Sequence, residues 1–179
     1  MTAYATTSVP GWAITGSSRA PAQPDATARS WIHVAIGVDG AATLRNWGAE
    51  LDGVAATRIS GVTAEDVRAG VAEAISQARV GVRVAIAGPS GDCLVVRAQL
   101  LSAGLEEDEL TILATSAGPI EVYCPHCRQV TRAAVGIGAV TTCAICGLGL
   151  QVYYHVSRLT GRYLGFQADA ETLPEGFAP

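Results

Sequence analysis

Two C-x-x-C pairs in the C-terminal third constrain this chain more than any other feature. Cys124 and Cys127 form the first pair, and Cys143 and Cys146 form the second after a spacer of fifteen residues. Each pair lets the backbone turn tightly, so that two thiolates can reach one ion, and four thiolates complete the tetrahedron that zinc or a single iron prefers. The sequence therefore predicts a closed metal site, structural or electron-carrying, with no open position for hydrolytic chemistry.

Two disulfides, or four buried cysteines without a ligand, are the alternative interpretation. Disulfides need an oxidising compartment, and the N-terminal residues show no charged region followed by the apolar run of a secretory signal. No segment approaches the roughly 18 apolar residues of a membrane-spanning helix. We therefore expect a cytoplasmic protein, with no membrane partner, whose thiols stay reduced.

The residues after each pair leave the metal open between zinc and iron. Rubredoxin-like iron knuckles usually have glycine after the second cysteine, where it frees backbone N–H groups to stabilise the sulfurs. Gly147 meets this pattern, whereas Arg128 at the equivalent position of the first pair does not. The sequence favours one Zn²⁺ per chain, with iron, and hence an electron relay, as the alternative.

The composition argues against general nucleic-acid binding. Twelve basic residues, all arginine, face sixteen acidic ones, which gives a formal net charge of −4. Four arginines could still form a basic face on the cysteine-rich segment, as a subunit interface or, alternatively, as the nucleic-acid surface of a regulatory zinc ribbon. They are Arg128, Arg132, Arg158 and Arg162.

The pattern of residues 31–118 predicts a small three-layer α/β domain. Runs at 31–38, 55–59 and 81–88 indicate strands, 106–115 supplies an acidic turn and the last strand, and amphipathic segments between them indicate helices. Strands alternating with helices imply a parallel sheet with right-handed crossovers. We expect the first helix to begin near Ala41, Thr63 and Ser90 to cap the next two helices, and Gly104 to end the last.

Three other segments complete the predicted organisation. Residues 1–30 are expected as an extended arm, with Trp12 and Ile14 packed either on their own domain or on a partner. After a hinge at 116–119, residues 119–168 are expected as a metal ribbon of short antiparallel strands at 121–123, 129–134, 150–156 and 162–167. Residues 169–179 are an acidic tail.

Several single residues carry expectations of their own. We interpret His155 as a hydrogen-bonded structural residue, with a fifth metal ligand, a proton carrier or an interface contact as alternatives, and His126 as solvent-facing. Tyr153 and Tyr154 should alternate across a strand, one in the core and one exposed. Cys93 lies outside both pairs and is expected as a small buried apolar residue.

The segment 82–115 resembles the last βαβ unit of the nucleotide-binding half of ferredoxin–NADP reductase-like proteins. Ala87-Gly88-Pro89 takes the place of the family's Cys-Gly-Pro, and Ala103-Gly104 takes that of its turn. The chain departs from the family because residues 34–44 lack the Gly-x-Gly loop and its proline, and no flavin-binding Arg-x-Tyr-Ser stretch occurs. The resemblance implies a nucleotide-binding fold that has lost its nucleotide, with residual NAD(P)H binding in an electron-relay subunit as the alternative, and leaves open whether a ligand pocket remains.

The combination of this domain with the four-cysteine segment resembles the small subunit of bacterial dimethylamine monooxygenase. The matching pattern after the second pair comprises His155, Ser157, Arg158, Gly165 and Asp169-Ala170-Glu171. The resemblance implies a non-catalytic accessory subunit of a complex that uses NADPH and O₂ for oxidative N-demethylation. It also implies two partners: a catalytic subunit that holds heme, and a reductase subunit that holds FMN and a [2Fe–2S] cluster.

Overall fold

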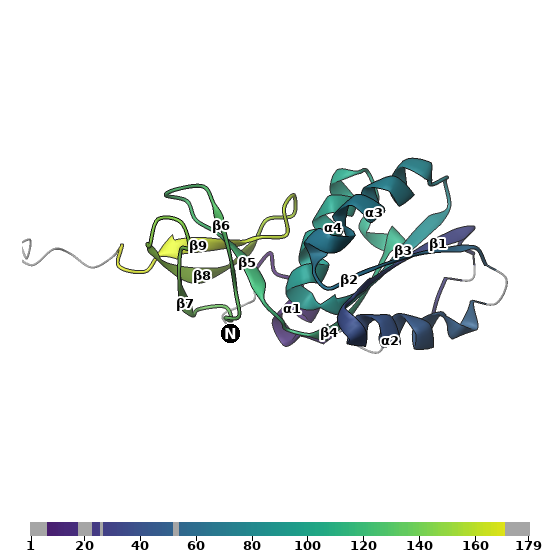
Figure 1. Cartoon of the computed structure of the whole chain (residues 1–179), viewed down its shortest axis with the longest axis horizontal. Helices are drawn as coiled ribbons and strands as arrows, with labels where there is room; N and C mark the ends of the chain where they lie inside the picture. The colour runs from purple at the N-terminus through teal and green to yellow at the C-terminus, as the bar shows by residue number, and fades with distance from the viewer. Residues whose placement is uncertain (1–6, 18–22, 26, 52–53, 171–179) are drawn as a thin grey trace, which may run out of the picture. The chain divides into compact units, whose positions relative to one another are not determined.

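The computed structural model describes residues 7–17, 23–25, 27–51 and 54–170 and divides the chain into two compact units. Pro10–Gly118 together with Arg158–Gly161 form the α/β unit. Of the described residues, 7–9, 119–157 and 162–170 form the ribbon unit. Each unit has its own sheet (Figure 1).

The α/β unit is built on four parallel strands in the order β2-β1-β3-β4. Its helices and strands alternate along the chain, which confirms the predicted α/β class with a parallel sheet. The elements are α1 (Gly11–Thr15), β1 (Ser30–Ile36), α2 (Gly37–Trp47), η1 (Gly48–Glu50), β2 (Ala56–Gly61), α3 (Ala64–Gln77), β3 (Val82–Pro89), α4 (Ser90–Ser102), η2 (Glu107–Glu109) and β4 (Leu110–Ser116).

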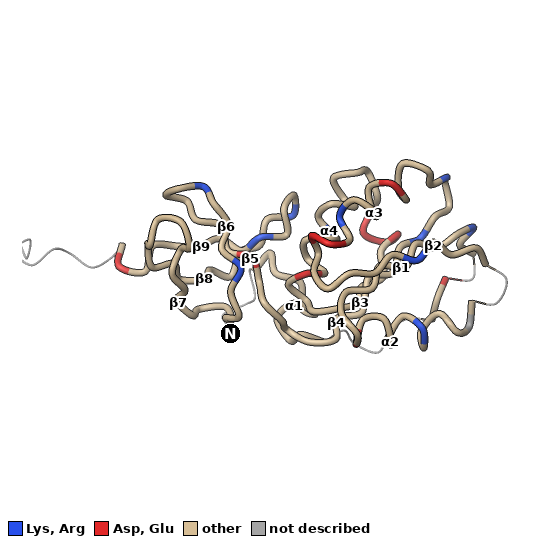
Figure 2. Tube along the Cα trace, in the orientation of Figure 1, with Lys and Arg blue, Asp and Glu red and all other residues tan. Residues whose placement is uncertain are grey.

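Side chains of β1 alternate between two cores on opposite faces of this sheet, as the period of two in a strand requires. Ile32, Val34 and Ile36 pack with residues of α3 and α4 on one face. Trp31 and Ala35 pack with residues of α2 on the other. Helices therefore cover both faces, and the α/β unit has three layers (Figure 1). Figure 2 shows basic positions scattered among acidic ones along this unit.

Two helix starts differ from those expected. The helix α2 begins at Gly37, directly after β1, because this glycine adopts a φ of +72° and turns the strand into the helix without a loop. Ser90 is the first residue of α4 and does not cap it with its side chain. Its Oγ instead donates to the carbonyl of Ala117 at 2.9 Å.

The start of α3 and the end of α4 follow the sequence pattern. Thr63 Oγ1 accepts from the Asp66 amide, and the Asp66 carboxylate accepts from the Thr63 amide at 2.8 Å, which forms a capping box. Gly104 follows the last residues of α4 with a φ of +98°, a left-handed conformation that glycine adopts without strain.

Residues 11–15 of the segment expected as an extended arm form the short helix α1 instead. Its Ala13 is buried, and Trp12 packs against the core between the sheet, α3 and α4. Burial of these apolar groups stabilises the turn beyond what its composition predicts. In this structure Trp12 therefore packs on its own domain, the first of the two arrangements expected for it.

The ribbon unit holds five short strands in the order β6-β5-β9-β8-β7. They are β5 (Ile120–Tyr123), β6 (Val130–Ala133), β7 (Val140–Thr142), β8 (Gly149–Val156) and β9 (Tyr163–Gln167). The expectation of a purely antiparallel ribbon was wrong, because β5 and β9 pair in parallel, with Val122 opposite Tyr163. This long-range pair joins the two cysteine hairpins into one sheet.

The N-terminal residues 7–9 belong to the ribbon unit rather than to an arm of the α/β unit. Ser8 Oγ donates to the Val156 carbonyl at 3.1 Å and accepts from the Val156 amide at 2.9 Å. Val9 is buried. These bonds satisfy the backbone of β8 where its pairing with β9 is irregular, between Val152 and Val156.

Candidate metal centre

The four predicted cysteine sulfurs converge on one point of the ribbon unit. The Cys124 and Cys146 sulfurs lie 3.8 Å apart, those of Cys127 and Cys143 lie 3.6 Å apart, and all four lie within 4.8 Å of one another. A tetrahedral ion with metal–sulfur bonds of about 2.3 Å separates its sulfurs by about 3.8 Å. The donor set and its spacing therefore fit one tetrahedral metal ion, and all four cysteines are free thiols rather than disulfides.

The two C-x-x-C turns have the same backbone geometry. The Arg128 amide donates to the Cys124 carbonyl at 2.8 Å, and the Gly147 amide donates to the Cys143 carbonyl at 3.0 Å. Arg128 has a φ of +62° and Gly147 a φ of +74°. An arginine thus adopts the left-handed conformation that glycine normally takes, at a cost of roughly 1–2 kcal/mol. The residue type at 128 therefore does not distinguish an iron knuckle from a zinc knuckle here.

Backbone N–H groups and neighbouring sulfurs shift the pKa values of the cysteine thiols in opposite directions. The amides of Cys146 and Ile145 donate to the Cys143 sulfur and lower the pKa of this thiol to about 6. The Gln129 amide also lowers the pKa of Cys127, but desolvation and the other three sulfurs outweigh it and raise this pKa to about 12. A bound cation would offset the repulsion among the sulfurs and allow all four to be thiolates.

Thr131 is a residue of this centre that sequence reasoning missed. It is buried on β6, and its Oγ1 accepts from the Ala144 amide at 3.0 Å, inside the second cysteine pair. This bond ties the second knuckle to the strand that follows the first. A lone threonine in a strand carries no sequence signal for this role, because its partner lies 13 residues away.

The centre is buried on one side and accessible on the other. The first cysteine of each pair, Cys124 and Cys143, is buried, whereas Cys127 is half-buried and Cys146 is exposed. Among the described residues that could ligate, the cluster contains these cysteines and no histidine. His126 is exposed, as predicted.

The aromatic residues of β8 differ from the expected alternation. Tyr153 and Tyr154 are both half-buried, and their rings stack with centroids 4.2 Å apart and hydroxyls 2.9 Å apart. The strand irregularity between Val152 and Val156 breaks the period of two. His155 is exposed beside both rings, with centroids 5.3 and 5.0 Å away.

The four arginines expected to form a basic face are divided between the two units. Arg162 pairs with Glu121 in the ribbon unit at 2.9 Å. Arg158 belongs to the α/β unit, where its guanidinium lies 3.7 Å from Glu107. Arg128 and Arg132 remain exposed on the ribbon unit. Carboxylates thus compensate the charges of Arg162 and Arg158.

At the start of α4, where parallel α/β folds can bind phosphate, polar groups of the chain already bond to each other. Nucleotide-binding sheets use a glycine-rich loop and the free N–H groups of a helix N-terminus. Here β1 enters α2 without a loop, and at the start of α4 the carbonyl of Ala117 accepts from the Gly91 amide at 3.3 Å and from Ser90 Oγ. Cys93, in the first turn of α4, is fully buried as predicted, and this burial raises the pKa of its thiol.

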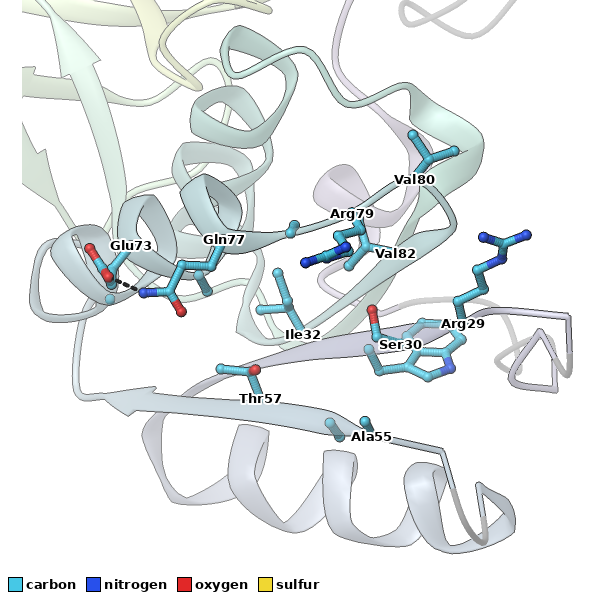
Figure 3. A pocket seen from close by; sticks show the side chains of 15 residues that line it. Arg29, Ser30, Ile32, Ala55, Thr57, Glu73, Gln77, Arg79, Val80 and Val82 are labelled. Atoms are coloured by element: carbon cyan, nitrogen blue, oxygen red, sulfur yellow. Dashed lines mark hydrogen bonds between the residues drawn. The ribbon is translucent and has the colours of Figure 1, made fainter.

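Described residues of the α/β unit line several cavities. One, of about 590 Å³, lies where β1 and β2 begin and α3 ends (Figure 3). Its charged residues Arg29, Glu73 and Arg79 are exposed, and Glu73 already pairs with Gln77. A second, of about 390 Å³, lies between α2 and β4. A third, beside His33, differs from both because it contains a buried imidazole.

Fold and site together define a protein with a small parallel α/β unit and a separate four-thiolate ribbon. Comparison with protein families agrees: residues 121–166 match the model of the C-terminal domain of DmmA-like dimethylamine monooxygenase subunits. The ribbon segment is therefore similar to this domain. All four cysteines and most of the ribbon strands lie within the matched residues.

A curated relative extends the similarity beyond this domain. The heme-dependent oxidative N-demethylase delta subunit of Ectopseudomonas mendocina (strain ymp) is 32% identical over 114 residues. The match covers 64% of this chain and 64% of the relative, so each has a part outside it. Together the two findings confirm the resemblance to the small subunit of dimethylamine monooxygenase.

Two further observations complete the comparison. No solved protein structure matches the chain significantly. The reductase-like character of the α/β unit therefore rests on the sequence resemblance. Within the described ranges, no helix combines the length and the apolar character that crossing a membrane requires.

Proposed function

We propose that this chain is a non-catalytic accessory subunit of an N-demethylating monooxygenase complex that uses NADPH and O₂ to oxidise dimethylamine. The observation that carries the proposal is the four-cysteine cluster inside residues 121–166, the segment that matches the dimethylamine monooxygenase subunit domain. The relative from E. mendocina supports it, because that protein is named as a subunit of a heme-dependent oxidative N-demethylase.

The α/β unit supports an accessory rather than a catalytic role. Its phosphate position is taken by the chain's own carbonyl at Ala117, and its β1–α2 junction has no loop to hold a dinucleotide. The redox chemistry then belongs to partners: a subunit with heme for substrate oxidation, and a subunit with FMN and a [2Fe–2S] cluster for NADPH oxidation. A cytoplasmic location would keep the four thiols reduced.

Zinc is the ion we propose for the ribbon. Cys124, Cys127, Cys143 and Cys146 would hold it, and a closed four-thiolate site supplies folding energy rather than reactivity. The ribbon needs such a contribution because its strands are short and its core is small. The buried apolar residues of the described sheet, besides the cysteines, are Ile120, Val122, Leu150, Val152, Val156 and Tyr163.

Co-expression with the heme and flavin subunits of such a complex tests the proposal. We expect the tagged chain to purify with both partners, with one zinc per chain and with heme and flavin absorption contributed by the companions. Cys146→Ser should lower the zinc content and the yield of complex. Cys93→Ser, the same change at a buried cysteine outside the cluster, should leave the zinc content unchanged. Recovery of the chain alone, with full zinc, would contradict the accessory role.

An electron-relay subunit with iron is the second candidate, and the geometry of the two cysteine turns supports it. Both turns place the residue after the second cysteine in a left-handed conformation, and backbone amides donate to the sulfurs of Cys127, Cys143 and Cys146. The exposed Cys146 sulfur would be the point of electron entry. One iron per chain, with thiolate charge-transfer bands that bleach on reduction, would establish this candidate instead of the zinc site.

A further inference from the structure

A cavity of about 510 Å³ lies beside α2, over strands β1 and β2 of the α/β unit. It exists because one helix covers this face of the sheet: α2 packs mainly on β3, β1 and β4 and contacts the edge strand β2 least. The cavity is separate from the position, at the start of α4, where related folds bind phosphate. Neither the accessory role nor the metal centre uses it.

His33 gives this cavity a polar inner end. The side chain lies on the α2 face of β1, is 6% exposed and lines the cavity. Within the described part of the chain, its Nε2 is one of two buried side-chain nitrogens without a hydrogen-bond partner, and the other, Trp31 Nε1, is not part of the lining. Buried polar groups are nearly always hydrogen-bonded, so an orphaned one that lines a cavity indicates a ligand-binding position.

Two arginines make the mouth of the cavity cationic. Arg58 is opposite His33 in the parallel pairing of β1 and β2, so both side chains lie on the same face of the sheet. Arg45 reaches the same cavity from α2. Both are exposed, and none of the described lining residues is acidic. Burial, followed by the charge of Arg58, lowers the pKa of His33, so its ring is neutral at pH 7.

The lining between the two ends is apolar and small. Ala35 of β1 and Ala41 and Leu44 of α2 form it, and the short alanine side chains leave room for a ring between helix and sheet. The order from inside to outside is thus a neutral hydrogen-bonding imidazole, an apolar slot and a pair of guanidinium groups. Guanidinium groups bind carboxylate and phosphate oxygens with matched, bidentate geometry.

We propose that this cavity binds a small aromatic anion, with its ring in the slot, a ring-borne polar atom at His33 Nε2 and its carboxylate or phosphate at Arg45 and Arg58. The cavity volume is within the range of small-molecule sites. The residue that defines the site is visible in the sequence as the one polar side chain inside the apolar run 31–38.

Tryptophan fluorescence of the full chain can test the proposal, because the rings of Trp31 and Trp47 lie 6.1 and 6.0 Å from that of His33. The probes are 4-hydroxybenzoate as the carboxylate and adenosine 5′-monophosphate as the phosphate, titrated at low salt. Their neutral analogues are phenol and adenosine. We expect a saturable change with at least one anion and at least tenfold weaker binding of its analogue. Which anion binds decides between carboxylate and phosphate.

Arginine variants distinguish binding in this cavity from nonspecific attraction of anions to surface arginines. Arg58→Gln and Arg45→Gln should each weaken binding about tenfold or more, and both positions are exposed, so the fold should persist in thermal unfolding. Arg68→Gln, at an exposed arginine of α3 paired with Glu65, is the matched control and should bind as the parent does. No saturable binding of either anion at millimolar concentration, or equal loss in the Arg68 control, would overturn the proposal.

Discussion

At the scale of single residues, one hydroxyl links the two halves of the metal centre. Thr131→Val keeps the shape of the side chain but leaves the Ala144 amide without its acceptor. Residues that orient ligands typically change metal affinity by 10–100-fold. We therefore expect the zinc affinity of Thr131→Val to fall by about this factor in competition with a chelating dye.

Thr142→Val provides the control for this change, because Thr142 is exposed on the neighbouring strand β7. Its zinc affinity should equal that of the parent chain. Parent-like affinity in the Thr131 variant would show instead that the two cysteine turns hold their geometry without this bond.

His33 should make the α/β unit less stable in mild acid. Burial, and then Arg58, lower its pKa in the folded state, while the unfolded chain retains the ordinary value of about 6.5. The unfolded state therefore binds more protons as the pH falls through 6.5, and stability is lost in that direction. The charged groups among the described residues lining its cavity are Arg45 and Arg58, which oppose protonation.

Urea unfolding at several pH values between 5 and 8 measures this effect. His33→Gln, which cannot titrate, should lose the part of the pH dependence that begins near 6.5. Equal pH profiles for the variant and the parent would show that the imidazole keeps its ordinary pKa in the folded chain.

At the scale of elements, a buried carboxylate joins α3 to α4. Asp92, in the first turn of α4, is fully buried, and its Oδ1 accepts from the amide of Ala64, the first residue of α3, at 2.9 Å. Asp92→Ala leaves that amide buried without an acceptor. We expect the free energy of unfolding to fall by about 1–3 kcal/mol, measured by urea unfolding followed through tryptophan fluorescence.

Two further variants define the origin of this loss. Asp92→Asn retains an oxygen acceptor and should lose less than Asp92→Ala. Asp39→Ala removes an exposed carboxylate from the first turn of α2 and should change stability by no more than about 0.5 kcal/mol. Similar losses in Asp39→Ala and Asp92→Ala would argue against the link between the two helices.

At the scale of the whole molecule, the two units should respond differently to metal removal. The α/β unit has two apolar cores of its own, whereas the ribbon unit relies on short strands around the cysteine cluster. The aromatic residues separate the signals: all three tryptophans lie in the α/β unit, and four of the five tyrosines lie in the ribbon segment 120–167.

A strong chelator should therefore abolish the near-ultraviolet circular dichroism of the tyrosines while tryptophan emission stays that of a folded α/β unit. Re-addition of zinc should restore the tyrosine signal. A simultaneous red shift of tryptophan emission would mean that the metal holds both units together.

Local patterns in the sequence were enough to predict several features of the structure. The spacing of the four cysteines predicted their cluster, because a C-x-x-C turn needs few residues and its geometry is set within the turn. Alternating apolar runs predicted a parallel α/β sheet, and Thr63 with Asp66 predicted the start of α3. Each of these depends on side-chain periodicity or on contacts a few residues apart.

Other features depended on contacts between distant segments, and only the tertiary structure decided them. The parallel pair of β5 and β9 joins residues about forty positions apart, such as Val122 and Tyr163. Arg128 adopts a left-handed conformation because the fold around the cysteine cluster over-determines that turn. His33 meets Arg58 and Arg45 because strand pairing and helix packing place them around one cavity. Local propensity carries no information about such partners.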